Sequence, residues 1–186
     1  MKQNIRVLGM DDSPFHRLRR GDCFLLFTLM RMDFTVEGFD RRAIEVDGTD
    51  STSAVEEILI NGIGKNADLL MANGITFCGF NLCDFNAISN RVGIPVITVT
   101  RKDPDIDSMR RAIERHHPEK EFALEILSRS SPSKIELPEG KTLFANVFGI
   151  GLKEAGSLIS RAIKTGLLPE PIRLSHLVGT GMFKDR

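Results

Sequence analysis

The thirteen residues from Leu69 to Asn81, LLMANGITFCGFN, carry no charged side chain, although an Asn-Gly pair lies within them. Such a segment can be a β-hairpin with an Asn-Gly turn, a buried strand that ends in a loop, or ordinary core. A two-residue Asn-Gly hairpin needs a strand on each side, but the residues after Gly74 soon change to a helical pattern. We therefore expect a buried strand that ends at Ala72 and a loop that begins at Asn73.

The remaining apolar segments predict the elements around this strand. Strands are expected at residues 5–10, 23–32, 34–46, 69–72, 95–100, 134–137 and 142–148, and helices at residues 51–60, 82–91, 106–116, 121–128, 152–165 and 173–178. Ser53 and Glu56 fit a capping box for the first helix, and Pro169-Glu170-Pro171 is expected to interrupt the chain before the last one.

The order of these elements predicts the fold class. The first three strands follow one another directly, as in an antiparallel meander, whereas helices separate the later strands, which should therefore be parallel. The sequence predicts an α/β fold: a mixed β-sheet with an antiparallel meander at the N-terminus and helices on both faces. No linker long enough to divide the 186 residues is visible, so we expect a single domain, residues 1–186.

Composition limits the possible partners. Lys and Arg together number 25, as do Asp and Glu, so the net charge is zero. A passive nucleic-acid binder usually has a basic excess, and here only the cluster of Arg17, Arg19 and Arg20 indicates a local basic face. No apolar run approaches the ~20 residues of a membrane span, and MKQNIRVLGMDD lacks the apolar region of a signal peptide.

The cysteines indicate a reducing compartment. Cys23, Cys78 and Cys83 form no Cys-x-x-Cys pair, and an odd number without such a pair points to neither a disulfide framework nor a zinc site. We expect free thiols in a cytoplasmic protein, with Cys78 a small buried apolar residue.

Polar residues follow several of the expected strands. Asp11 follows the first, Asp47 the third with Asp50 close behind, Asn73 the fourth, and Lys102 the strand at 95–100. Ligands of open α/β sheets bind at the carboxyl ends of the strands. Clustered carboxylates repel one another unless a cation lies between them, and Mg²⁺ prefers a few oxygen ligands with retained waters. Two such ions about 4 Å apart can support phosphodiester cleavage.

Each of these residues also has a structural interpretation. Asp11 begins Asp-Asp-Ser-Pro, which is good turn sequence, and Asp47 precedes a glycine, as in many turns. Asp50 could cap the helix that follows. Asn73 tolerates the left-handed backbone of a turn, and Lys102 could be an ordinary solvated lysine.

Several segments resemble a known family. IRVLGMDDSPF, VDGTD, NGITFCGFNLCD, GIPVITVTRK and LPEPIRLSHLVGTG look like those of the archaeal domain-of-unknown-function family 99. The resemblance covers nearly the whole chain, and GITFCGFN and PEPIRLSHL are its most specific parts. That family is similar in turn to endonuclease V, a metal-dependent nuclease with an RNase H-like fold. The resemblance implies that fold, a divalent cation such as Mg²⁺ or Mn²⁺, and nucleic acid as a partner.

The resemblance assigns roles to the residues at the strand ends. Endonuclease V uses carboxylates on its first strand, near its third and after its fourth. Asp11 matches the first, and Asp47 or Asp50 is nearest to the second. The third falls on Asn73, where the family pattern usually has aspartate. A lysine after the fifth strand matches Lys102, but Phe148-Gly149 stands where endonuclease V has a histidine.

Two functions follow from this comparison. The first is a divalent-metal-dependent nuclease with Asp11, Asp47, Asn73 and Lys102 as catalytic residues and Asp11, Asp47 and Asp50 as metal ligands. The second is a catalytically impaired relative that binds nucleic acid, a nucleotide or a protein, because the neutral Asn73 removes one negative charge. His176, in the PEPIRLSH segment, is expected to pack or form a hydrogen bond rather than bind a metal.

Overall fold

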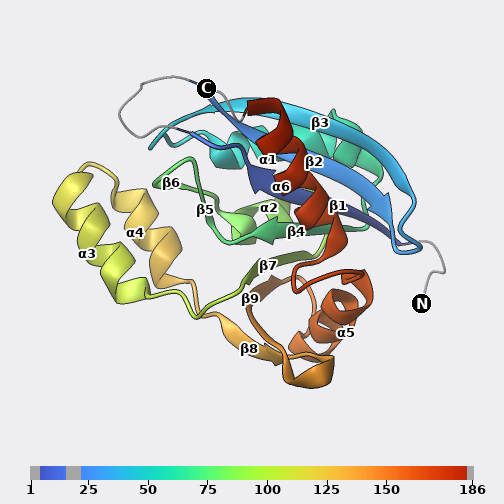
Figure 1. The fold of residues 1–186 in the computed structure, drawn as a ribbon. Coiled ribbons are helices and arrows are strands. Elements are labelled where there is room, and N and C mark those ends of the chain that lie inside the picture. The colour runs from blue at the N-terminus through green and yellow to red at the C-terminus, as the bar shows by residue number, and fades with distance from the viewer. Residues whose placement is uncertain (1–4, 16–21, 184–186) are drawn as a thin grey trace.

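The computed structural model of the protein (Figure 1) describes residues 5–15 and 22–183. One seven-stranded sheet has the order β3-β2-β1-β4-β7-β9-β8. Its strands are β1 (Arg6–Asp12), β2 (Asp22–Arg31), β3 (Val36–Glu45), β4 (Leu69–Asn73), β7 (Val96–Thr100), β8 (Ser133–Glu136) and β9 (Thr142–Phe148), and β5 (Thr76–Phe77) and β6 (Asn81–Leu82) form a separate short ladder.

The sheet is mixed, as predicted, with an antiparallel meander of β1, β2 and β3. β4 lies parallel to both β1 and β7. The prediction that all later strands are parallel is wrong for β9, which is antiparallel to β7 and to β8. β8 does run in the same direction as β7, but its hairpin partner β9 lies between the two. The rule that strands separated by helices run parallel therefore gave the correct direction for β8. It did not predict that β9 lies between β7 and β8.

Helices cover both faces of the sheet, as predicted. They are α1 (Ser51–Ile60), α2 (Phe85–Val92), α3 (Ile106–His116), α4 (Glu121–Ser128), α5 (Leu152–Ala162) and α6 (Glu170–Phe183), with short 3-10 turns η1 (Ile63–Asn66) and η2 (Pro138–Gly140). Within the described ranges, no helix is both long and apolar enough to cross a membrane.

One predicted helix cap and one predicted helix start are wrong. The Ser53–Glu56 capping box does not form, because α1 begins at Ser51 and the Ser53 hydroxyl donates to the carbonyl of Asp50 from inside the first turn. The last helix is also longer than predicted. Pro171 lies in the first turn of α6, where proline is tolerated because the N–H group that it lacks would have no helical partner.

Alternating residues of the central strands face two separate cores. Leu8 and Met10 of β1 pack in a cluster with residues of α1, α2, α3 and α4. Val7 and, from β4, Leu69 and Met71 pack in a second cluster with residues of α5 and α6. Because side chains alternate along a strand, residues 11 and 73 belong to the face that α6 covers, and residue 12 belongs to the other face.

α6 packs closely against the backbone of β1, and Figure 1 shows this helix lying across β1 and β2. Gly9 makes this possible, because a Cβ atom at this position would lie 2.5 Å from the Cβ of Pro171 and closer still to the Pro171 carbonyl group. The Ser175 hydroxyl of α6 donates to the Gly9 carbonyl (3.1 Å) and lies 2.9 Å from Oγ1 of Thr28 on β2. These contacts fix the position of the helix over the carboxyl half of β1.

The uncharged segment at residues 69–81 is a strand that ends in a loop. β4 ends at Asn73, and Gly74 has a φ of 78° as the chain leaves the sheet. The Asn-Gly pair is thus not a hairpin turn. The turn of the short β5–β6 ladder lies further on, at residues 78–80, where Cys78 has a φ of 47° and Gly79 a φ of 91°.

Candidate functional site

The ends of β1 and β4 place an acid and an amide side by side. The parallel register pairs Met10 with Ala72, so Asp11 and Asn73 are the next residues on adjacent strands. Asp11 is only 2% exposed. Its Oδ1 accepts hydrogen bonds from the Asn73 side-chain amide (3.2 Å) and from the backbone N–H of Asp12 (3.0 Å).

α6 brings a third side chain to the same point. Nδ1 of His176 lies 3.0 Å from Oδ2 of Asp11, and the His176 side chain is 57% exposed. The hydrogen-bonding role predicted for His176 is confirmed, but nothing in the sequence indicated that its partner is the acid of β1. The only sequence signal was its place in PEPIRLSHL, one of the two most specific segments of the family resemblance.

Burial is the largest cause of the raised pKa values of the neighbouring Asp11 and Asp12. Burial raises the pKa of Asp11, although the hydrogen bonds from Asn73 and the Asp12 backbone and the contact with His176 oppose this change. Burial, and then the nearby charge of Asp11, raise the pKa of Asp12 to about 6, against the hydrogen bond that the backbone N–H of Cys78 donates to Asp12 (2.6 Å). A nearby cation would favour the ionised form of both acids.

Asp47 and Asp50 use their carboxylates to hold loops. Oδ1 of Asp47, a residue with a φ of 52°, accepts the backbone N–H of Phe80 (2.7 Å). Asp50 accepts the backbone N–H of Glu45 (3.2 Å) and the side-chain amide of Asn81 (2.6 Å). Asp50 lies at the N-cap position of α1, yet its side chain makes no capping hydrogen bond there.

The three predicted metal-binding carboxylates do not gather at one point. Within residues 5–15 and 22–183, the only group of three His, Cys, Asp or Glu residues whose donor atoms lie within 4.8 Å of one another is Asp12, Cys23 and Cys78. Lys102 lies exposed just beyond β7, and its carbonyl accepts the hydroxyl of Thr100 (2.9 Å). The predicted basic face at residues 17–20 lies outside the described residues.

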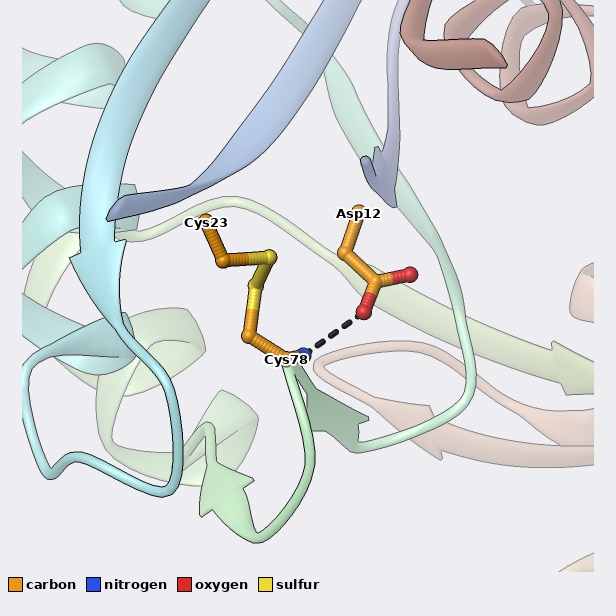
Figure 2. A group of neighbouring side chains, drawn as sticks. All are labelled: Asp12, Cys23 and Cys78. Atoms are coloured by element: carbon orange, nitrogen blue, oxygen red, sulfur yellow. Dashed lines mark hydrogen bonds between the residues drawn. A yellow bond between two sulfur atoms is a disulfide. The ribbon is translucent and has the colours of Figure 1, made fainter. Parts of the chain in front are cut away.

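The prediction of three free thiols is wrong. Cys23, at the start of β2, and Cys78, in the turn between β5 and β6, form a disulfide, with Cα atoms 6.0 Å apart (Figure 2). The cysteines are 55 residues apart in the sequence, and only the tertiary structure brings them together. Cys83 is the remaining thiol and is buried, and burial raises its pKa.

Comparison with known proteins identifies the family. The model of the family described as endonuclease dU matches residues 3–183. The chain belongs to the endonuclease dU family. A UPF0215 protein of Thermococcus gammatolerans is 34% identical over 185 residues, which cover 98% of this chain and 94% of that protein.

Solved structures show which fold this member of the endonuclease dU family shares. A protein of unknown function from Archaeoglobus fulgidus is 27% identical with a TM-score of 0.83, covering 96% of this chain and 98% of that one. An endonuclease V of Ciona intestinalis, in complex with a 23mer DNA containing an inosine followed by a ribo-adenosine, has a TM-score of 0.64 at 11% identity, over 99% of this chain and 87% of that one. The expected endonuclease V-like, RNase H-like fold is thus confirmed.

The side chains around Asp11 have the donor types of a small divalent-cation site. Asp11 offers a carboxylate, Asn73 an amide and His176 an imidazole. The 3.2 Å between Asp11 Oδ1 and the Asn73 amide nitrogen is close to the roughly 2.9 Å between adjacent ligands of an octahedral Mg²⁺, and rotation of the amide would present its oxygen there. The imidazole favours Mn²⁺ over Mg²⁺, because Mg²⁺ prefers oxygen.

Proposed function

We propose that this protein is a divalent-metal-dependent endonuclease that cleaves phosphodiester bonds of nucleic acid. The observation that carries the proposal is the buried Asp11 carboxylate, which receives Asn73 from β4 and His176 from α6 at the carboxyl ends of two parallel strands. A buried acid supported from two other elements, with a half-exposed imidazole beside it, is typical of a reactive site rather than of a turn. Membership of the endonuclease dU family supports the same function.

Each residue has a defined part in this proposal. Asp11 is the principal metal ligand, and Asn73 and His176 hold its carboxylate. Both would also offer donor atoms to the ion, which for His176 departs from the expectation that it does not bind a metal. When bound, Mg²⁺ or Mn²⁺ would polarise a phosphoryl oxygen and increase the acidity of a water molecule. Lys102, exposed beyond the adjacent strand β7, would neutralise a phosphate of the substrate. In this proposal Asp47, whose carboxylate accepts the backbone N–H of Phe80, would hold the loop at residues 78–80 instead of binding the ion expected from the sequence.

The substrate proposal rests on the named relatives. The family description, endonuclease dU, indicates DNA that contains deoxyuridine. The related fold of the Ciona endonuclease V was solved with DNA that contains inosine. We therefore take a deoxyuridine-containing DNA strand as the substrate of this chain, with inosine-containing and unmodified strands as the comparison.

The test combines metal binding with cleavage. Calorimetry with Mn²⁺ should show binding to the wild-type protein, and Asp11→Asn should abolish both binding and cleavage of the labelled strand. Asn73→Asp should tighten Mn²⁺ binding, because it restores a negative charge to the site. Asp103→Asn, which removes an exposed acid from the loop after β7, is the matched control and should leave both unchanged. Cleavage that persists in Asp11→Asn would refute the proposal.

The alternative is a binding module that has lost catalysis. The hydrogen bond from the Asn73 amide to Asp11 favours it, because an amide that donates to the carboxylate occupies an oxygen that a metal would need. In that case the wild-type protein would bind the DNA strand without cleaving it and would not bind Mn²⁺. Asn73→Asp alone would then gain Mn²⁺ binding, a result that would replace the nuclease proposal with this one.

A further inference from the structure

A second group of donor atoms lies on the opposite face of β1 from Asp11. The Asp12 carboxylate and the sulfur atoms of Cys23 and Cys78 all lie within 4.8 Å of one another (Figure 2). The three residues come from β1, the start of β2 and the turn between β5 and β6. Both cysteines are 0% exposed, and Asp12 is partly buried.

We propose that, in the dithiol form of the protein, Cys23, Cys78 and Asp12 bind one thiophilic divalent cation such as Zn²⁺. Thiolate sulfur and carboxylate oxygen are both common zinc ligands, and zinc takes four ligands in a tetrahedron. A water molecule would take the fourth position, because the nearby Ser13 hydroxyl already accepts the backbone N–H of Phe24 and donates to the Pro14 carbonyl. This site is separate from the one proposed at Asp11 and does not depend on the nuclease activity.

The charge around Asp12 supports a cation at this point. The carboxylate of the partly buried Asp12 accepts the backbone N–H of Cys78 (2.6 Å), and Asp12 forms no ion pair within the described ranges. The like charge of Asp11 acts on the Asp12 carboxylate more strongly than the opposite charge of a protonated His176. A partly buried carboxylate without a cationic partner is unfavourable, and a metal ion held by two thiolates would supply the missing positive charge.

The change between the two forms is a balanced two-electron reaction. A dithiol reductant donates two electrons and two protons to the Cys23–Cys78 disulfide; the S–S bond breaks, two thiols form, and the reductant becomes a disulfide. Zn²⁺ then displaces the two thiol protons to solvent as it binds the thiolates. In both forms Cys78 is cross-linked to β2, so the turn at residues 78–80 stays in place beside Asp12 and Asp47.

Cobalt substitution tests the proposal directly. Protein reduced under nitrogen with a phosphine, which is not itself a thiol, is titrated with Co²⁺. We expect one equivalent to bind and to produce a thiolate-to-cobalt charge-transfer band, which Zn²⁺ then removes. Cys23→Ser and Cys78→Ser should lose the band and weaken binding by more than about 100-fold, because the thiolates are the main ligands. Asp12→Asn should weaken binding while the band remains.

The controls distinguish this site from the third thiol and from the proposed nuclease site. Cys83→Ser removes the buried third thiol and should leave the band unchanged, and Asp11→Asn should do the same although it abolishes Mn²⁺ binding at the proposed nuclease site. Alkylation of the wild-type protein followed by mass spectrometry needs no variant: Zn²⁺ should protect Cys23 and Cys78 in the reduced protein. A reduced wild-type protein that shows neither the band nor this protection, or a band that survives Cys23→Ser, would overturn the proposal.

Discussion

Replacing Gly9 by alanine should force α6 away from β1 and so disturb the contact between His176 and Asp11. The added Cβ would lie 2.5 Å from the Cβ of Pro171, whereas carbon atoms in favourable contact are roughly 3.5–4.0 Å apart. The helix must therefore move by at least about 1 Å. Backbone atoms of Pro171 are also in the way, so a side-chain rotation cannot relieve the clash.

The expected cost follows from these contacts. Overpacking a core costs about 1–3 kcal/mol. Displacement of the helix also weakens the two hydrogen bonds of Ser175, to Gly9 and to Thr28, each worth about 1 kcal/mol. Alanine recovers about 0.5–1 kcal/mol of backbone entropy relative to glycine. The free energy of unfolding should therefore fall by about 2–4 kcal/mol, a large part of the roughly 5–15 kcal/mol typical of a folded protein.

Urea unfolding of Gly9→Ala and of the wild-type protein measures this loss. Gly181→Ala is the matched control, because Gly181 lies on the same helix and an added Cβ there would meet no atom within 4 Å. That variant should be neutral or more stable by up to about 1 kcal/mol. If Gly9→Ala unfolds within about 0.5 kcal/mol of the wild-type protein, the close approach of α6 does not hold and the position derived for His176 is wrong. Titration of folded Gly9→Ala with Mn²⁺ should also show weaker binding than the wild-type protein.

Three further predictions concern buried polar groups. The native pKa of Asp12 is raised from its ordinary 3.8 to about 6, mainly by burial, so its contribution to stability is fully present below pH 4 and is lost as the pH rises through 6. In a chelating buffer, Asp12→Asn should therefore gain about 2–3 kcal/mol relative to the wild-type protein between pH 4 and pH 7 in urea unfolding; a gain that is the same at both pH values would contradict the shift. Lys120 is 4% exposed and its ammonium donates to the carbonyls of Asp47 and Phe80, so Lys120→Met should cost about 2–4 kcal/mol by leaving these carbonyls unpaired; an unchanged urea midpoint would refute this role. Without a reductant, the native protein should not react with a thiol-specific disulfide reagent and the urea-unfolded protein should show one thiol, since Cys83 is buried and is the only cysteine outside the disulfide; three reactive thiols on unfolding would contradict the cross-link.

Local sequence patterns predicted an element well where its boundaries depend only on neighbouring residues. α3, α4 and β9 have the predicted residues, because apolar periodicity and flanking turn residues are local signals. The predictions for the direction of β9 and for the start of α6 were wrong for a different reason. A strand's neighbour depends on the order of the sheet, and Pro171 could be judged only when the start of the helix was known.

The sequence by itself determined that Asp11 and Asn73 lie at the carboxyl ends of two buried strands, because an apolar run followed by a polar residue is visible within a few positions. Only the tertiary structure decided which side chains meet them. His176 lies 165 residues from Asp11 in the chain, and Cys23 and Cys78 are 55 apart, so their contacts depend on sheet order and helix packing rather than on local preference. The missing side chain of Gly9 is the clearest case: its absence matters only because α6 returns from the far end of the chain to lie against it.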